Sequence, residues 1–437
     1  MTSADAQSLV LGAGRSGVAA AALLLRDGKS VCLYDRDADR LHTAAQSLAA
    51  PVQTLCGPEL PDFDGFEQVI ASPGIPVEAH PRLVAEVDLA AAHLRAPLIG
   101  VTGTNGKSTT VVLIGEMLRR SGLRVAVGGN LGTALCELVG NDDSHDWVVA
   151  ELSSFQLEHA SRLRPRIAVL LNLAPDHLDR HGTLEAYAAA KAKLAALREP
   201  GGVLVANADD TWANAIAAAA PAPTRLFSTE RVLGEGAWLE DDALQCSLSE
   251  AERLRVPLSS LAPSCSTHPQ NALAASLVAR EAGADGDAIR QVLEGFAGLA
   301  HRTQHVCTRG GVAYVDDSKA TNPAAAAASL RAQAAPTWWL SGGRNKGLSF
   351  DSLRSVPTQL REVIVFGEAA PELAQALEGL APITRVDSLD AALRHAAAAA
   401  KPGDVVLLSP ACASFDQFES FEARGDHFAR LARALPC

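Results

Sequence analysis

One stretch of the sequence combines glycines, a lysine and hydroxyl groups at spacings that suit nucleotide phosphates. It runs from Gly100 to Thr109 (GVTGTNGKST) and leads into a segment whose apolar residues recur at helical spacing. Backbone N–H groups of such a loop can surround phosphate oxygens, Lys107 can neutralise them, and the Ser108 hydroxyl can ligate Mg²⁺. The commoner form of this motif has glycine where Val101 stands. Gly-Lys-Ser-Thr between a strand and a helix still predicts a nucleoside triphosphate site.

Carboxylates and histidines follow two later apolar segments. Glu151 comes directly after the expected strand Trp147–Ala150, where a Mg²⁺-holding carboxylate is usual in such folds. The run Asp176–His181 (DHLDRH) follows the expected strand Ile167–Leu171. Because open α/β sheets bind ligands beyond the carboxyl ends of their strands, this run is interpreted as a site for metal and phosphate.

A second glycine-rich loop lies near the N-terminus. Gly12–Gly17 (GAGRSG) follows an apolar segment, and Asp35 ends the next one. Glycines there allow backbone N–H groups to approach a phosphate at a helix N-terminus. Taken alone the loop fits a dinucleotide or another nucleotide equally well. The turn Ser72–Ile75 (SPGI) could close over the same ligand.

Three loops in the last third of the chain are rich in charged and hydroxyl side chains. They are Asp316–Pro323 (DDSKATNP), Gly342–Gly347 (GGRNKG) and Ser409–Asp416 (SPACASFD), and each follows an expected strand. Such residues are seldom found in a hydrophobic core, but they suit the binding of an anionic substrate and of a phosphoryl group during its transfer. Phe296–Arg302 (FAGLAHR) precedes the first of these strands.

These loops need a scaffold that brings strand ends together. Apolar runs ending in Gly, Asn or Asp alternate with helical stretches, a pattern typical of α/β units around mainly parallel sheets. A turn-rich segment at 224–266 is less patterned. The remaining expected strands are Ser8–Leu11, Val31–Tyr34, Val69–Ala71, Leu98–Val101, Val203–Ala206, Val312–Val315, Trp338–Leu340, Val363–Phe366 and Val405–Leu408.

Length and composition narrow the class of protein. The 437 residues predict several domains, which we place at 1–94, 95–295 and 296–437. No apolar run is long enough to suggest a membrane span or a signal peptide. The net charge of −12 with dispersed Lys and Arg excludes a broad nucleic-acid surface. The eight scattered cysteines form no C-x-x-C pair and predict reduced thiols in the cytoplasm.

Taken together, these motifs resemble the Mur ligase family along essentially the whole chain. Thr102–Ser108, Gly128–Gly132 and Glu151–Leu157 are similar to its central domain, and the later loops look like its glutamate-adding branch. The resemblance implies three α/β domains. The first would be Rossmann-like and bind a UDP-sugar, the second would be a P-loop ATPase-like domain with a mostly parallel sheet, and the third would be Rossmann-like and bind glutamate.

The resemblance also implies the reaction. ATP would phosphorylate the carboxylate of UDP-N-acetylmuramoyl-L-alanine, and the amine of D-glutamate would then attack the acyl phosphate. The implied cofactors are ATP, two Mg²⁺ ions and a carbamylated Lys191, although Lys191 read from its alanine-rich surroundings alone would be a solvated lysine. No partners other than these small molecules are expected, and the chain is expected to be a monomer.

Site roles carry over from the resemblance by position. Groups acting on the moving phosphoryl would be Lys107, His177, Lys191, Arg302 and Lys319. ATP would contact Thr104, Asn105, Gly106, Lys107, Ser108, Thr109, Asn271, Arg302 and Asp317. The metal ions would be held by Ser108, Glu151, His177 and Lys191. The UDP-sugar would contact Arg15, Ser16, Asp35, Ser72, Pro73, Gly74, Asn130, Ser153 and Gln156. Glutamate would contact Thr321, Lys346, Ser414, Phe415 and Phe421.

Two positions differ from the pattern expected of the family. Arg36 and Asp37 follow Asp35, where a hydroxyl and then an arginine are expected, so contacts to uracil would be rearranged. The run Thr267–Gln270 stands where a His-Asn pair is expected before Asn271, which bears on adenine binding.

Four alternative functions remain open at this level. A nicotinamide dehydrogenase would use Gly12–Gly17 but leave Gly106–Thr109 without a role. A P-loop switch or motor protein would carry an Asn-Lys-x-Asp run, which this sequence lacks. A folylpolyglutamate synthase-like ligase would lack the first glycine-rich region. A ligase specific for L-glutamate cannot be separated by spacing alone.

Overall fold

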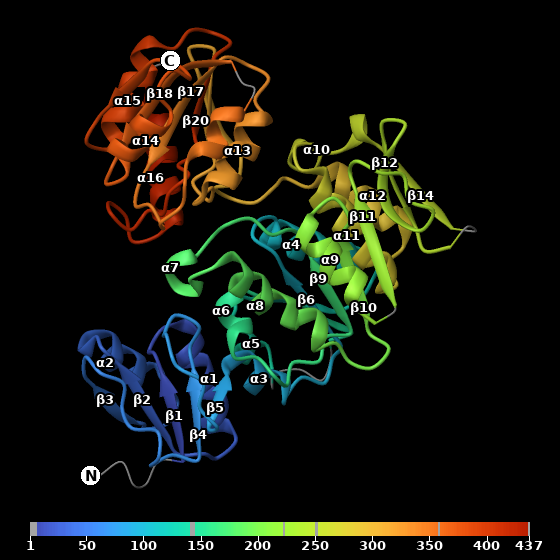
Figure 1. Cartoon of the computed structure of the whole chain (residues 1–437). Coiled ribbons are helices and arrows are strands. Elements are labelled where there is room, and N and C mark those ends of the chain that lie inside the picture. The colour runs from blue at the N-terminus through green and yellow to red at the C-terminus, as the bar shows by residue number, and fades with distance from the viewer. Residues whose placement is uncertain (1–6, 140–144, 222, 250–251, 357–358, 436–437) are drawn as a thin grey trace. The chain divides into compact units, whose positions relative to one another are not determined.

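The structure is a computed structural model that describes residues 7–139, 145–221, 223–249, 252–356 and 359–435. Within these residues the strands form three sheets, and helices alternate with strands along most of the chain (Figure 1). The α/β class expected from the sequence is confirmed. No helix of the described chain is long and apolar enough to cross a membrane.

The first sheet is parallel throughout and has the strand order β3-β2-β1-β4-β5. Its central strands are buried on both faces, which explains why their sequences are mostly apolar. The strands are β1 (Ser8–Leu11), β2 (Val31–Asp35), β3 (Gln53–Cys56), β4 (Gln68–Ala71) and β5 (Leu83–Ala85). The helices are α1 (Arg15–Arg26), α2 (Ala38–Ser47) and α3 (Glu86–Ala91).

The second sheet has the order β14-β13-β12-β11-β10-β9-β6-β8-β7. It is parallel from β7 to β12, and β12, β13 and β14 then pair antiparallel. The strands are β6 (Leu98–Thr102), β7 (Val125–Gly129), β8 (Trp147–Glu151), β9 (Ile167–Leu170), β10 (Val203–Asn207), β11 (Thr224–Ser228), β12 (Gly236–Glu240), β13 (Ala243–Ser247) and β14 (Arg253–Pro257). The helices are α4 (Lys107–Arg120), α5 (Leu135–Leu138), α6 (Ser154–Glu158), α7 (Leu178–His181), α8 (Leu184–Ala196), α9 (Thr211–Ala219), the 3₁₀ turn Leu258–Ser260, α10 (Pro263–Ser266), α11 (Pro269–Glu281) and α12 (Gly286–Gly295).

The third sheet has the order β15-β16-β20-β17-β18-β19 and is parallel except for the β15–β16 pair. Its strands are β15 (Gln304–Arg309), β16 (Val312–Asp316), β17 (Thr337–Gly342), β18 (Leu360–Phe366), β19 (Ile383–Arg385) and β20 (Val405–Leu408). Its helices are α13 (Pro323–Arg331), the 3₁₀ turn Asp351–Ser355, α14 (Ala370–Ala376), α15 (Leu389–Ala399) and α16 (Phe421–Ala434).

The chain divides into two compact units. The first unit comprises residues 1–173 and 185–296, and the second comprises 174–184 and 297–437. The segment 174–184 thus belongs to the second unit, although it lies between β9 and α8 in the sequence. The three-domain division remains a prediction.

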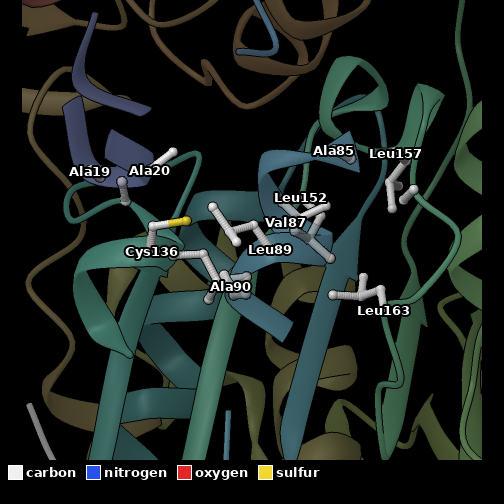
Figure 2. Close-up of a cluster of buried hydrophobic side chains, with 14 of the residues drawn as sticks. Ala19, Ala20, Ala85, Val87, Leu89, Ala90, Cys136, Leu152, Leu157 and Leu163 are labelled. Carbon is white, nitrogen blue, oxygen red and sulfur yellow. The ribbon is translucent and has the colours of Figure 1, made fainter. Parts of the chain in front are cut away.

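The first two sheets share a hydrophobic core within the first unit. Helix α3 lies between them, and Figure 2 shows its Val87 and Leu89 near Cys136 of α5 and near Leu152, which follows β8. All four side chains are at most 7% exposed. Burial of large apolar side chains contributes about 1.5–3 kcal/mol each. This core therefore fixes the glycine-rich loop of the first sheet relative to the loops of the second.

Candidate functional site

A cavity of about 670 Å³ lies beside the first glycine-rich loop. Gly12 has φ of +97°, and a Cβ placed on Gly17 would lie 1.8 Å from the Gly12 carbonyl oxygen. Only glycine at both positions lets α1 start this close to β1. The predicted UDP-sugar residues other than Ser153 line the cavity, namely Arg15, Ser16, Asp35, Ser72, Pro73, Gly74, Asn130 and Gln156.

The floor of this cavity contains polar groups suited to a ligand. Asp35 is buried and accepts hydrogen bonds from the Ala13 N–H at 2.7 Å and the Asp37 N–H at 3.0 Å, which holds the loop in shape. The buried Ser72 hydroxyl has no hydrogen-bond partner within the described residues. A buried hydroxyl without a partner is costly, so a ligand oxygen here would relieve that cost.

Two arginines at the cavity rim were not among the predicted contacts. Arg36 and Arg40 both line the cavity. Asp37 caps α2 by accepting from the N–H groups of Asp39 and Arg40, and the hydrogen bond from Arg40 is the main cause of its lowered pKa. The Arg40 guanidinium lies 3.9 Å from Asp35 and 3.6 Å from Asp37. The replacement expected to rearrange uracil contacts therefore places Arg36 at the rim and Asp37 in a helix cap, and Arg40 adds a second arginine at the rim.

The opposite wall comes from the second sheet. Arg15 donates to the Asn130 carbonyl at 3.2 Å, and the Asn130 amide donates to Glu151 at 2.7 Å. Ser153 lies outside the lining but forms a capping box with Gln156 at the start of α6, which orients the Gln156 side chain. The cavity wall is thus hydrogen-bonded to the predicted metal ligand Glu151.

The second phosphate loop joins β6 to α4, as the sequence predicts. Gly103 and Gly106 have φ of +154° and +86°, and the loop ends at the N-terminus of the 14-residue helix α4. Thr104 and Thr109 are buried, and Asn172, which follows β9, bonds both the N–H and the carbonyl of Asn105. N–H groups at such a helix start form a ready site for phosphate. Sequence reasoning had not singled out Asn172.

Two predicted lysines lie against this loop. Lys107 donates to the carbonyls of Gly103 and Thr104, both at 2.9 Å. Lys191 is 1% exposed, donates to the Gly103 carbonyl at 2.9 Å, and lies 4.6 Å from the Tyr187 ring centroid. The reading of Lys191 as a solvated lysine is therefore wrong. Tyr187 and Lys191 are four residues apart and share one face of α8, but the sequence did not indicate which face of this helix is buried.

Asn271 lies below the loop, at the start of α11. It is 4% exposed, and a Cβ on Gly106 would come within 2.2 Å of its Oδ1 atom. The adenine contact predicted for Asn271 remains a prediction. Because Asn271 packs against Gly106, it also supports the phosphate loop.

The donors near the loop fit a magnesium ion. Ser108 and Glu151 are buried polar residues, and strands β6 and β8 pair with Val101 opposite Glu151. A hydroxyl and a carboxylate are oxygen ligands of the kind Mg²⁺ prefers. His177, the third predicted ligand, lies in the second unit and adopts a left-handed φ of +53°. In the part of the chain that the structure describes, no group of three or more His, Cys, Asp or Glu is arranged so that it could hold a metal ion.

In the second unit, Asp316 ends β16 and Asp317 follows it. His301 lies 2.7 Å from Asp316 through its Nδ1 atom, and this hydrogen bond is the main reason that the His301 pKa is raised. Asp317 accepts from the Ser409 hydroxyl at 2.9 Å and from the Ser329 hydroxyl. Burial raises the pKa of Asp317 to about 6, and the charge of Arg302 opposes that rise.

A buried arginine joins the loops that carry the predicted glutamate contacts. Arg424, in the first turns of α16, is fully buried and donates to the carbonyls of Ser318, Gly342 and Cys412 at 2.8, 3.3 and 3.1 Å. It also donates to the Ser318 hydroxyl at 2.9 Å. Lys319 lies over the Phe421 ring, 4.8 Å from its centroid. One side chain thus fixes the ends of three strands against the helix that begins at Phe421.

The fourth predicted lysine, Lys346, forms an ion pair that the sequence does not reveal. Its ammonium lies 2.7 Å from Asp176, which also accepts from the Asn322 amide at 3.0 Å. Burial raises the pKa of Asp176, but the charges of Lys346 and His177 outweigh it, so this pKa is lowered overall. Thr321 is half-buried, Ser414 is buried and Phe415 is 64% exposed.

The predicted glutamate contacts therefore converge only in part. Thr321, Lys346, Ser414 and Phe421 lie on loops that Asp176, Asn322 and Arg424 hold together, whereas most of the Phe415 ring faces solvent. Arg424 was missed as a site residue, and its only signal in the sequence was its place after Phe421 at a helix start. Asp176 belonged to the run predicted to bind metal and phosphate, but its contact with Lys346 was not predicted.

Comparisons with known proteins agree along the whole chain. The profile of the Mur ligase middle domain matches residues 101–278, and that of the Mur ligase glutamate ligase domain matches residues 301–412. The UDP-N-acetylmuramoylalanine--D-glutamate ligase of Pelotomaculum thermopropionicum is 38% identical and covers 98% of this chain and 97% of its own length. The ligase of the same name from Anaeromyxobacter dehalogenans is 42% identical, with 97% and 96% covered. Among solved structures, a pseudomurein peptide ligase type C from Methanothermus fervidus has a similar fold, with a TM-score of 0.63 at 17% identity, covering 98% of this chain and 99% of its own.

Proposed function

The chain belongs to the Mur ligase family, and from that premise we propose that it joins D-glutamate to UDP-N-acetylmuramoyl-L-alanine at the expense of ATP. One observation carries the proposal beyond the family. A single compact unit holds two glycine-rich loops, each at a helix N-terminus, with a 670 Å³ cavity beside the first. An enzyme that activates a nucleotide-linked carboxylate with ATP needs both of these phosphate sites.

The cavity of the first sheet is the proposed site of the UDP-sugar. Its backbone N–H groups at the start of α1 suit a diphosphate, and the Ser72 hydroxyl can bind a ligand oxygen. Arg36 and Arg40 at the rim suit a uracil carbonyl or a ribose hydroxyl. Asn130 and Gln156 extend the site toward the second sheet, where the ligand's carboxylate must react with ATP.

The loop of the second sheet is the proposed ATP site. Lys107 would exchange its two carbonyl partners for phosphate oxygens, and α4 would present its N–H groups to them. Mg²⁺, held by Ser108 and Glu151, would neutralise phosphate charge when bound. The γ-phosphoryl group passes to the acceptor carboxylate. The carboxylate oxygen, a poor leaving group, thereby becomes part of a phosphate, which is a good one. The chain's task is then to position the groups and to exclude water.

The loops of the third sheet are the proposed amino-acid site. Lys346 and the hydroxyls of Thr321 and Ser414 suit the two carboxylates of glutamate. Its amine attacks the acyl carbon, the tetrahedral intermediate collapses, and phosphate leaves as the amide forms. Lys319 and Arg302 would balance the charge on the departing phosphate.

Carbamylation of Lys191 is part of the proposal. A carbamate keeps one N–H for the Gly103 carbonyl and adds carboxylate oxygens suited to Mg²⁺. Lys191→Ala is expected to lose most activity and to regain part of it with added short carboxylic acids. Mass spectrometry under bicarbonate should also detect the added carbamate mass in the unmodified enzyme. Full activity of the alanine variant, or no recovery with any acid, would remove the carbamate from the mechanism.

Three coarser expectations complete the proposal. The described cysteines are all free, which supports a reducing compartment and hence the cytoplasm. We also propose a monomer, and three domains at 1–94, 95–295 and 296–437. The three sheets support the domain division, since β5 ends and β6 begins on either side of the first boundary. Light scattering and limited proteolysis test these points.

Phosphate release is the direct test of the reaction. The enzyme is supplied with ATP, Mg²⁺ and UDP-N-acetylmuramoyl-L-alanine, and then with D-glutamate, L-glutamate or no amino acid. Release that depends on D-glutamate supports the proposal. Release with L-glutamate alone would keep the mechanism but change the substrate, and release with neither would contradict both.

A further inference from the structure

Asp176 is a buried carboxylate at the centre of the proposed amino-acid site. It is 4% exposed and contacts Lys346 through one oxygen and Asn322 through the other, at 2.7 and 3.0 Å. These partners are 170 and 146 positions away in the sequence, and all three residues belong to the second unit. Because a buried charge must be paired, this carboxylate is committed to the same lysine that is proposed to bind glutamate.

The chemistry of the substrate requires such a group, given the proposed function on which this inference rests. Glutamate carries two carboxylates and one ammonium. The predicted contacts Thr321, Lys346, Ser414 and Phe421 provide hydroxyls, a cation and a ring, but no anion. The neighbouring acids have other partners, since Asp316 binds His301 and Asp317 binds Ser329 and Ser409. Asp176 is the acid in contact with the lysine of the site.

We propose that Asp176 binds the ammonium of the incoming amino acid, in exchange for its ion pair with Lys346. A substrate carboxylate takes Lys346, and the substrate nitrogen takes the oxygen that Lys346 leaves. The number of charge-assisted contacts is conserved, so neither buried group is left unpaired during binding. Asp176 therefore orients the nitrogen through the oxygen that now contacts Lys346.

In this role Asp176 would determine which enantiomer of glutamate the enzyme accepts. With both carboxylates of glutamate fixed by Lys346 and the hydroxyls, inversion at the α-carbon changes only the direction of the nitrogen. A third, specific contact to that nitrogen is then required to separate D- from L-glutamate. Asp176 supplies this contact.

The test compares D-glutamate with glutarate, which has both carboxylates and no amine. The enzyme is assayed at saturating ATP and acceptor, with glutarate as a competitive inhibitor. Asp176→Asn should raise the KM for D-glutamate about 10- to 100-fold, because a hydrogen bond between charged groups is lost. The inhibition constant of glutarate should stay within about threefold or fall, because Lys346 loses its competing partner. Lys346→Met should weaken both ligands, and Glu378→Gln, at an exposed position after α14, should change neither.

Two results would overturn the assignment. Equal weakening of D-glutamate and glutarate in Asp176→Asn would mean that Asp176 only positions Lys346, and no change in either would place it outside the site. If the asparagine variant does not fold, Asp176→Glu keeps the charge and moves it by one methylene group. Its loss should again fall on D-glutamate and spare glutarate, and equal loss would count against the role. D-glutamate-dependent phosphate release by the unmodified enzyme separates these outcomes from failure of the proposed function, because without that release both proposals fail.

Discussion

The cavity of the first sheet and the proposed amino-acid site of the third sheet occupy equivalent places in their folds but are built differently. Both lie at the carboxyl ends of parallel strands. The first is open, with about 670 Å³ of space beside a glycine-rich loop, and its long charged side chains, such as Arg36 and Arg40, line the cavity without filling it. In the second site the charged side chains are paired within the protein. Lys346 forms an ion pair with Asp176, and Arg424 donates hydrogen bonds to three carbonyls. A site shaped by the backbone is already open before a ligand binds. In a site built from long charged side chains, the charges pair with one another, and a ligand must replace these internal contacts.

The largest effect is expected where backbone shape forms the site. Gly17→Ala would place a Cβ 1.8 Å from the Gly12 carbonyl oxygen, so α1 must move away from β1. We expect a loss of about 3 kcal/mol or more in the free energy of unfolding, measured by urea denaturation. Gly14→Ala is the matched control, since its Cβ meets nothing within 4 Å. Similar stability of the two variants would mean that the first site is not held by this close approach.

The second effect concerns a charge buried in the third-sheet region. The pKa of Asp317 in the folded protein is about 6, raised from 3.8 by burial. The folded state therefore binds this proton more tightly, and the stability it contributes is present at low pH and lost as pH rises through about 6. The loss should amount to about 2 kcal/mol between about pH 4 and pH 7.5. Asp317→Asn cannot ionise and should gain stability relative to the parent over that range, measured by urea unfolding at both pH values. A difference between the two proteins that does not change with pH would refute the buried-charge account.

The third effect tests whether Arg424 holds the second site together. Arg424→Lys keeps the charge but cannot reach the three carbonyls and the Ser318 hydroxyl at once. We expect the KM for D-glutamate to rise about tenfold, while the KM for ATP and for the UDP-sugar stays within about threefold. Arg430→Lys, exposed on the same helix, is the control. Equal losses for all three substrates would point to general unfolding, which thermal denaturation would reveal.

The smallest effect is expected at the rim of the first site. The Arg40 side chain is 59% exposed, and its contacts with Asp35 and Asp37 are long. Exposed charge contacts are worth about 0.2–1 kcal/mol, so Arg40→Ala should raise the KM for the UDP-sugar by no more than about fivefold. The KM for D-glutamate should not change. Gln46→Ala, exposed on α2 and outside the cavity, serves as the control. A loss as large as that from a buried group would show that Arg40 recognises the ligand by a direct, desolvated contact.

The difference between the two sites also explains what the sequence could predict. Gly12–Gly17 and Gly103–Lys107 are local patterns in which each residue has one geometric reason to be present, so both loops were found where they lie. The strands beside them were found because they are apolar without interruption. Edge strands such as β3 and β14 were not expected, since alternate residues are exposed and the segments are short.

Side-chain pairing across the chain left no local signal. Asp176 and Lys346 are far apart in the sequence, and nothing near either residue predicts the other. Lys191 looked like any lysine on an alanine-rich helix, because its burial depends on how α8 packs under the phosphate loop. The association of residues 174–184 with the second unit is a tertiary effect of the same kind.

The central claim is that the two sites serve one ligation through an acyl phosphate, and isotope transfer tests it most directly. UDP-N-acetylmuramoyl-L-alanine labelled with oxygen-18 in its carboxylate is incubated with the enzyme, ATP, Mg²⁺ and D-glutamate. Mass spectrometry should find one labelled oxygen in the released phosphate and a nucleotide product that has gained glutamate with loss of water. Phosphate without the label, or a nucleotide of unchanged mass, would contradict the account.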